Sequence, residues 1–232
     1  MRFGRPKVLL PVVHCIRPSQ AHVAIRVAID NGADGVFLIN QGGMSVDEIV
    51  ALADDVRAES FVGVNLLGES IPSVFGKIAG AIIAGLWRDD AGISVTAEIT
   101  YARVAMDFND RRKRSAWRGL YFGGVAFKYR ASVAPEHYGD VARAAMQMGV
   151  DVITTSGPAT GEPPTVEKVA AMRAAIGDHA LAIASGGTPE NVSGFLPYVD
   201  AFLVATGIES SFGVFDAGKV RALADQIHAT TP

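Results

Sequence analysis

Short apolar runs that alternate with longer amphipathic segments are the feature that most constrains the fold of this chain. Eight such runs occur, and they span residues 7–14, 35–40, 61–67, 84–89, 119–128, 151–156, 180–185 and 201–206. Runs that are apolar throughout are typical of strands buried on both faces, and helices between successive strands imply a parallel sheet.

The segments between these runs carry helix signals. They predict helices over 19–31, 45–59, 72–81, 96–117, 135–149, 165–176 and 217–228, and one more that begins at Thr188. Ser45 and Glu48 have the spacing of a capping box, and Thr188-Pro189-Glu190 has the composition of a helix start. Eight strand–helix units in 232 residues, with no linker between them, predict a single (β/α)8 TIM barrel over residues 1–232.

Composition narrows the class of protein. The chain is 49% hydrophobic, which excludes disorder as its main state, and its net charge of −3 argues against a nucleic-acid partner. The single cysteine, Cys15, cannot form an internal disulfide, and the longest apolar stretches are far below the roughly 18 residues of a membrane span. We therefore expect a cytoplasmic protein with no membrane span, whose apolar helices permit a homo-oligomer.

Polar residues follow most of the apolar runs, where a barrel of this kind has its active site. These endings are His14, Asn40, Asn65, Asp89 with Asp90, Lys128, Thr155 with Ser156, Ser185 and Thr206. Buried strands commonly end where polar residues begin, so the serine and threonine residues at these strand ends need no functional explanation. A histidine, a lysine and an aspartate at one rim are harder to explain in that way, and they predict His14, Asp89 and Lys128 as catalytic residues.

The chemistry of these three residues stays open at this level. Lys128 fits a Schiff-base nucleophile, a point charge against phosphate or carboxylate, or a structural ion pair with Asp89 or Asp90. Side chains alternate along a strand, so at most one of the two aspartates faces the mouth of the barrel, which is its opening at the carboxyl ends of the strands. That carboxylate fits a general base, a stabiliser of a cationic sugar transition state or a ligand of Mg²⁺, the one cofactor that the sequence suggests. His14 fits a general acid or base, or a structural histidine.

Glycines follow the last two runs, in Ser185-Gly186-Gly187-Thr188 and in Thr206-Gly207-Ile208. Glycine lets backbone amides approach an anion closely, and barrels bind phosphate at these two loops. The pattern predicts a phosphate site at Gly186, Gly187, Gly207 and Ile208; the alternative is that the glycines serve only tight turns.

Six further residues are predicted to contact substrate. They are Asn40, Asn65, Ser156, Thr160, Glu162 and Ser185. Thr160 and Glu162 belong to the proline-stiffened loop 157–164, which fits a lid or clamp as well as a rigid connector. The basic run 110–114 ends a predicted helix, where cations complement the helix dipole and stay solvated.

Three segments, NGADGVFLIN (31–40), TSGPATGEPP (155–164) and SGGTPENV…DAFLVATGIE (185–209), resemble the BtpA (SgcQ-like) family of TIM-barrel proteins. The third segment is shared more widely with phosphate-binding barrels. The resemblance implies the barrel fold, and the family has been linked to photosystem I biogenesis.

These observations predict an enzyme that acts on a small phosphorylated substrate, such as a sugar phosphate or a phosphoribosyl compound. An isomerase, a lyase and a transferase all need an anchored phosphate and a polar rim. A transferase of a pyrophosphorylated sugar predicts a Mg²⁺ requirement, whereas an aldolase-like lyase predicts borohydride trapping at Lys128. The alternative is a non-catalytic assembly or regulatory protein that retains a phosphate pocket.

Overall fold

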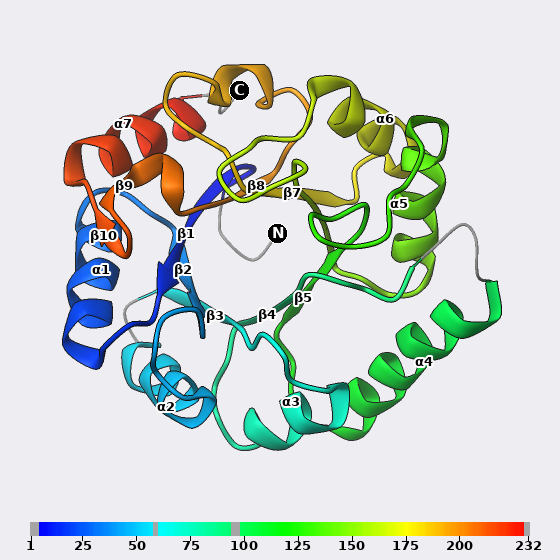
Figure 1. The fold of residues 1–232 in the computed structure, drawn as a ribbon, viewed down its shortest axis with the longest axis horizontal. Helices are drawn as coiled ribbons and strands as arrows, with labels where there is room; N and C mark the ends of the chain where they lie inside the picture. The colour runs from blue at the N-terminus through cyan, green and yellow to red at the C-terminus, as the bar shows by residue number, and fades with distance from the viewer. Residues whose placement is uncertain (1–4, 58–59, 94–97, 230–232) are drawn as a thin grey trace.

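Eight parallel strands close into a barrel in chain order, with β1 paired to β8 (Figure 1). The computed structural model describes residues 5–57, 60–93 and 98–229. The strands are β1 (Val8–His14), β2 (Gly35–Ile39), β3 (Phe61–Asn65), β4 (Gly85–Arg88), β5 (Leu120–Gly124), β6 (Val152–Thr155), β7 (Ala180–Ala184) and β8 (Ala201–Val204). The predicted (β/α)8 barrel is therefore confirmed.

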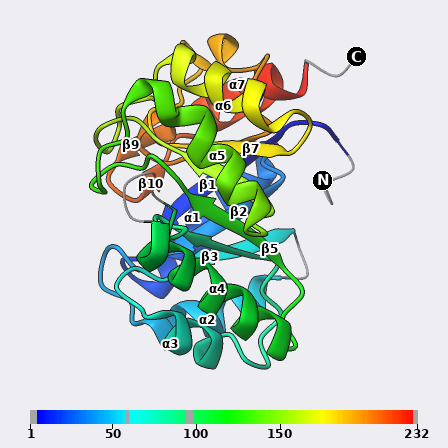
Figure 2. The same ribbon diagram turned by 90° about the vertical axis from the view of Figure 1, so that its right-hand side faces the viewer.

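Helices surround this barrel, and the view turned by 90° shows the strands enclosed between them (Figure 2). They are α1 (Pro18–Asp30), α2 (Val46–Val56), α3 (Ile71–Lys77), α4 (Glu98–Arg114), α5 (Tyr138–Gln147), α6 (Val166–Ile176) and α7 (Ala217–His228). The capping box of α2 forms as predicted, because Ser45 Oγ accepts a hydrogen bond from Glu48 N–H and Glu48 Oε2 accepts one from Ser45 N–H. The predicted start of α4, at 96, lies outside the described residues.

The segment after β7 corrects one prediction. No α-helix begins at Thr188 in this fully described segment; the chain forms a turn and then a short 3-10 helix, Val192–Gly194. Asn191 explains the difference. Its Oδ1 accepts from Thr188 N–H at 2.8 Å and its Nδ2 donates to Gly186 O at 2.7 Å, so the side chain ties the loop closed.

Strand β5 corrects a second prediction. It ends at Gly124, four residues before Lys128, whereas the other seven strands end within two residues of their predicted limits. Val125 N–H still bonds to Thr154 O, but Ala126 adopts a left-handed φ of 45° and the chain leaves the barrel. Lys128 therefore lies in the loop after β5 and not on the strand.

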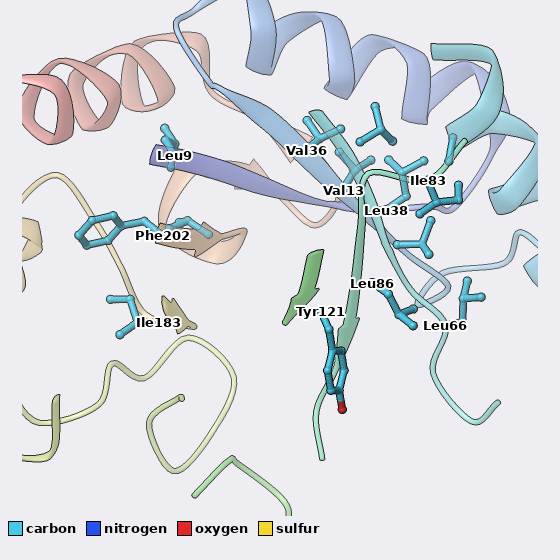
Figure 3. Close-up of a cluster of buried hydrophobic side chains, with 14 of the residues drawn as sticks. Leu9, Val13, Val36, Leu38, Leu66, Ile83, Leu86, Tyr121, Ile183 and Phe202 are labelled. Atoms are coloured by element: carbon cyan, nitrogen blue, oxygen red, sulfur yellow. The ribbon is translucent and has the colours of Figure 1, made fainter. Parts of the chain in front are cut away.

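Two apolar layers hold the barrel. The outer layer fills the space between strands and helices and includes Leu9, Val36, Leu38, Ile183 and Phe202 (Figure 3). The inner layer fills the barrel itself.

The inner layer is uneven in size around the ring. Phe37, Trp87 and Phe122 project from β2, β4 and β5, whereas β7 contributes Ala182 and Ala184. From β8, Ala201 and Leu203 join this layer, so its side chains are smallest along β7.

Three aspartates clamp the amino-terminal end of the barrel. Each precedes an even-numbered strand and accepts a backbone N–H from the strand before it; the pairs are Asp34 with Leu9, Asp151 with Tyr121 and Asp200 with Leu181, at 2.7–2.9 Å. The same three carboxylates also pair with the side chains of His228, Arg112 and Arg173, respectively. Arg112 of the basic run is thus a structural partner, which corrects the expectation for this residue, whereas Asp110, Lys113 and Arg114 of the same run are exposed.

A hairpin that the sequence did not predict follows β8. It consists of β9 (Glu209–Ser211) and β10 (Val214–Phe215), and it contacts α1 through a hydrogen bond from Gln20 Nε2 to Gly213 O at 3.1 Å. In the part of the chain that the structure describes, no helix is long and apolar enough to cross a membrane.

Candidate active site

A cavity of about 140 Å³ opens at the carboxyl ends of the strands. Its wall includes His14, Asp89 and Lys128, together with residues of the loops after β7 and β8. The three residues predicted as catalytic therefore meet at one cavity, although 114 positions of sequence separate the first from the last.

His14 ends β1 and is 6% exposed. Its Nδ1 lies 2.9 Å from Glu209 Oε1, and the Phe212 ring stacks on the imidazole at 4.5 Å. Glu209 Oε1 also accepts the Gly213 N–H at 2.9 Å, which fixes the carboxylate. Since Nδ1 is engaged, Nε2 is the ring nitrogen that remains for a ligand.

Glu209 is a site residue that the sequence analysis missed. It lies 195 positions from His14, in the unpredicted hairpin, and no local pattern links the two.

Asp89 follows β4 and accepts a hydrogen bond at Oδ1 from Asn65 Nδ2 at 3.0 Å. Burial raises the pKa of Asp89, and this effect exceeds the lowering by Asn65 and by the charge of Lys128. Asp90 faces elsewhere and accepts the Gly92 N–H at 2.7 Å, as alternation of side chains predicts.

Lys128 reaches the mouth from the loop after β5. Its backbone N–H donates to Ser156 Oγ at 2.8 Å, and burial lowers the pKa of its ammonium while the charge of Asp89 raises it. Within the described ranges, no carboxylate lies within 4 Å of Lys128 Nζ, so the structural ion pair with Asp89 or Asp90 does not form. A carboxyl and an amine both shifted towards neutrality in one cavity are typical of acid–base sites.

The two predicted phosphate loops touch each other. A Cβ at Gly207 would lie 2.0 Å from Gly187 O, and one at Gly186, whose φ is 67°, would lie 2.1 Å from Pro163 N. The Ile208 N–H donates to Ala205 O within its own turn. The N–H groups of Gly187 and Gly207 have no hydrogen-bond partner among the described residues. Of the four predicted phosphate residues, Gly186 lines the cavity, whereas Gly187, Gly207 and Ile208 lie outside its wall.

Two of the six predicted substrate contacts line the mouth. Ser185 Oγ accepts from Gly161 N–H at 3.0 Å, and Thr160 N–H donates to Tyr129 OH at 3.1 Å. Both contacts join the loop after β6 to its neighbours, which makes this loop a braced wall of the cavity.

The other four residues lie outside the wall of this cavity. Asn40 binds both backbone polar groups of Leu67, Asn65 supports Asp89, and Ser156 supports the backbone of Lys128. Glu162 is exposed. Asn65 and Ser156 thus orient residues of the mouth without lining it.

Lys168 is a second residue that the sequence analysis missed. It lies in the first turn of α6, is 9% exposed, and donates from Nζ to Ser156 O at 2.8 Å and to Ala126 O. Burial lowers its pKa to about 8. A lysine in a first helical turn is electrostatically unfavourable, and this was the available sequence signal.

Cys15, beside His14, belongs to the core. Its thiol is fully buried and contacts Val13 O at 3.5 Å, and burial raises its pKa to about 12. A thiol of this kind is a poor nucleophile.

The residues around Asp89 do not form a magnesium site on their own. Mg²⁺ needs several oxygen ligands, whereas Asp89 faces the amide NH₂ of Asn65 and the positive charges of Lys128, Arg130 and Arg88. No cluster of three or more potential metal ligands occurs among the residues described. A Mg²⁺ that arrives on a pyrophosphorylated substrate would need only a single carboxylate from the protein.

Comparison with known proteins identifies the fold of this chain. No family model matches the chain, and no curated protein matches it by sequence. Among solved structures, the chain is similar to native KDPGal, with a TM-score of 0.71 and 15% identity over 99% of both chains.

Two further solved structures have the same architecture. Phosphoribosyl anthranilate isomerase from Thermus thermophilus has a TM-score of 0.64 and 15% identity over 96% of this chain and 98% of that chain. (S)-3-O-geranylgeranylglyceryl phosphate synthase from Thermoplasma acidophilum, in complex with sn-glycerol-1-phosphate, has a TM-score of 0.67 and 13% identity over 97% and 94%. At these identities the similarity establishes that the chain folds as a TIM barrel.

Proposed function

We propose that this protein is an enzyme that acts on a small phosphorylated substrate. The observation that carries the proposal is the mouth cavity, whose wall contains His14, Asp89 and Lys128 beside the glycine loops after β7 and β8. Two of the similar barrels support it, because one is named for a phosphoribosyl compound and the other holds sn-glycerol-1-phosphate.

In this proposal the phosphate binds at the loops after β7 and β8. The free N–H groups of Gly187 and Gly207 donate to its oxygens, and Gly186 allows the close approach. Ile208 belongs to the same loop but does not donate to the phosphate, since its own N–H bonds to Ala205 O within the turn.

Proton transfer falls to the three side chains of the mouth. His14 Nε2 takes or gives a proton while Glu209 holds the ring at Nδ1, and Asp89 and Lys128 supply a second acid–base pair or stabilise charge. An isomerase, a lyase and a phosphoribosyl transferase all suit this arrangement. Membership of the BtpA family, a cytoplasmic location and a homo-oligomer are further parts of the proposal.

Binding of phosphate is tested by thermal unfolding and calorimetry. We expect inorganic phosphate, ribose 5-phosphate and phosphoribosyl pyrophosphate to stabilise the protein, and unphosphorylated ribose to have no effect. A ligand at 100 times its Kd raises the free energy of unfolding by about 2.7 kcal/mol.

The matched variants are Gly187→Glu and Gly187→Gln. A Cβ at Gly187 meets only a methyl group of Val204, at 3.1 Å, a tight contact that a small shift of this side chain must relieve, so circular dichroism of both variants is compared with the parent first. The glutamate should abolish phosphate binding by charge repulsion, whereas the isosteric glutamine should retain part of it. Equal binding by the two variants would place the phosphate elsewhere and remove the basis of the proposal.

Catalysis is tested on the phosphorylated ligand that stabilises the protein most. We expect its conversion to be visible by NMR, and to be lost in His14→Gln and in Lys128→Met while binding persists. Borohydride trapping of Lys128 would identify a lyase. A ligand that binds and is not converted, in the presence and absence of Mg²⁺, would favour the assembly or regulatory protein.

A further inference from the structure

A second cavity, of about 270 Å³, lies beside the mouth. Lys128 and Tyr129 belong to the walls of both cavities. We call the second one the side cavity; it lies between the loop 126–133, Tyr138 of α5, and the residues around the start of α6. The two cavities are therefore neighbours that share part of their walls at Lys128 and Tyr129.

The side cavity is lined by positive charge. Lys128, Arg130 and Lys168 belong to its wall, and no aspartate or glutamate does. The amino-terminal end of α6, which carries the positive end of the helix dipole, also meets the cavity at Thr165.

Lys168 is the most informative of these residues. Lysine is rarely buried to this extent without an anionic partner, because removing its charge from water is costly. Its ammonium bonds to the Ser156 and Ala126 carbonyl oxygens, and no carboxylate lies within 4 Å of it in the described part of the chain. The ammonium also lies 5.2 Å from the centroid of the Tyr138 ring, which belongs to the same cavity wall. Its two hydrogen bonds use two of its three N–H groups, so the third can donate to an acceptor in the cavity.

The loop that forms the cavity is strained. Ala126 and Tyr129 both adopt left-handed backbone conformations, with φ of 45° and 60°, and neither is a glycine. Such residues cost on the order of 1–3 kcal/mol each and persist where the surroundings enforce them. Here Lys168 and Thr155 Oγ1 both bond to Ala126 O, and Tyr129 OH binds Thr160. These hydrogen bonds hold the strained loop in place, and with it Lys128 at the boundary between the two cavities.

From this arrangement we infer that the substrate carries a second anionic group, which binds in the side cavity against Lys168 and Arg130 while its phosphate occupies the glycine loops. The inference rests on the proposed function and narrows its substrate class to phosphorylated compounds with a carboxylate or a second phosphate at a distance from the first.

Separate probes for the two cavities test the inference. Malonate serves as the carboxylate probe and inorganic phosphate as the phosphate probe, each measured by calorimetry and by thermal unfolding of the full chain. We expect Lys168→Met to weaken malonate binding by about tenfold, the effect of losing one charge-assisted hydrogen bond, and to leave phosphate binding unchanged. Gly187→Glu should abolish phosphate binding and leave malonate binding unchanged.

Two more variants keep the test decisive. Arg130→Gln changes an exposed side chain and should weaken malonate binding even if Lys168→Met fails to fold. Lys113→Met, at the exposed end of α4, is the matched control and should leave the binding of both malonate and phosphate unchanged.

The outcomes separate the two proposals. Malonate binding that Lys168→Met and Arg130→Gln leave intact, or no malonate binding at all, would overturn the second anion site while the phosphate site stands. Phosphate binding that survives Gly187→Glu and is lost in Lys168→Met would support a second phosphate in the side cavity. Phosphate binding unaffected by either variant would overturn the proposed phosphate site, while the malonate measurements would still decide the side cavity on their own.

Discussion

Asp89 occupies a position that disfavours its charge. Burial raises its pKa, because the charged form of the carboxyl group loses solvation in the folded protein. This cost is typical of groups that a site needs in a reactive state.

Asp89→Asn should therefore raise the free energy of unfolding at about pH 7. A raised pKa means that the folded state binds the proton more tightly than the unfolded chain, so the contribution of Asp89 to stability falls as pH rises through the raised pKa. The advantage of the variant should shrink as pH is lowered towards the ordinary carboxyl range. Urea unfolding across this range measures it, with Asp55→Asn on exposed α2 as control. A variant less stable than the parent at neutral pH would contradict the prediction.

Glu209 should matter for stability and for the state of His14. Glu209→Ala removes the acceptor of both His14 Nδ1 and the Gly213 N–H, and should lower the free energy of unfolding by about 1–3 kcal/mol. In nitrogen NMR spectra, His14 Nδ1 should carry a proton in the parent protein, and this fixed state should be lost in Glu209→Gln. Glu136→Ala, at an exposed position, should change neither the free energy of unfolding nor the spectrum of His14. A His14 spectrum unchanged by Glu209→Gln would show that the contact does not orient the ring.

The residues of the mouth were predictable to the extent that they follow strands. His14 ends its strand as predicted, because a long apolar run stops there. Glu209 was not predictable, since its role depends on a contact across the closed ring and its own segment has no strong pattern. Lys168 was missed for a related reason: its partners are carbonyl oxygens, which leave no trace in the sequence.

Among the elements, β5 shows that the length of an apolar run does not by itself predict where a strand ends. The residues Val125, Ala126 and Phe127 continue the apolar run, yet the strand ends before them. Backbone conformation ends this strand, and the bonds that enforce it come from Thr155 and Lys168 on neighbouring elements. The seven other strand ends coincide with a change of polarity, and those were predicted closely.

Glycine in β3 is required by the inner layer. A Cβ at Gly63 would lie 2.3 Å from the buried Phe37 ring, which packs against Trp87 and Phe122 and has no room to move. Gly63→Ala should lower the free energy of unfolding by about 1–3 kcal/mol, as overpacking does.

The matched control is Gly76→Ala in α3, where an added Cβ meets nothing within 4 Å. Alanine stabilises a helix relative to glycine, so this change should raise the free energy of unfolding by about 0.5–1 kcal/mol. Urea titration compares the two variants. Equal effects of the two substitutions would mean that the inner layer can repack.

At the scale of the whole molecule, a closed ring predicts cooperative unfolding. Every strand of the barrel pairs with two others, and β1 depends on β8 for one of its edges. We expect residues 1–232 to unfold as one domain.

The two tryptophans test this expectation. Trp87 lies inside the barrel, and Trp117 lies in the outer layer, where its Nε1 donates to Ile83 O. The variants Trp87→Phe and Trp117→Phe each leave one reporter, and both should give the same urea midpoint by fluorescence after correction for the change in stability measured by circular dichroism. Distinct midpoints for the remaining reporter and the circular dichroism of the same variant would reveal separate units.

The contact between His14 and Glu209 has a consequence for how this protein is made. The first strand leaves the ribosome long before the hairpin after β8, and a contact of such long sequence separation is among the last to form in folding. A nascent chain that has formed most of its strands still lacks the partner of His14 and the loop after β8. The wall of the mouth cavity is therefore completed only when the segment after β8 has been made, and shorter translation products would lack the partner of His14.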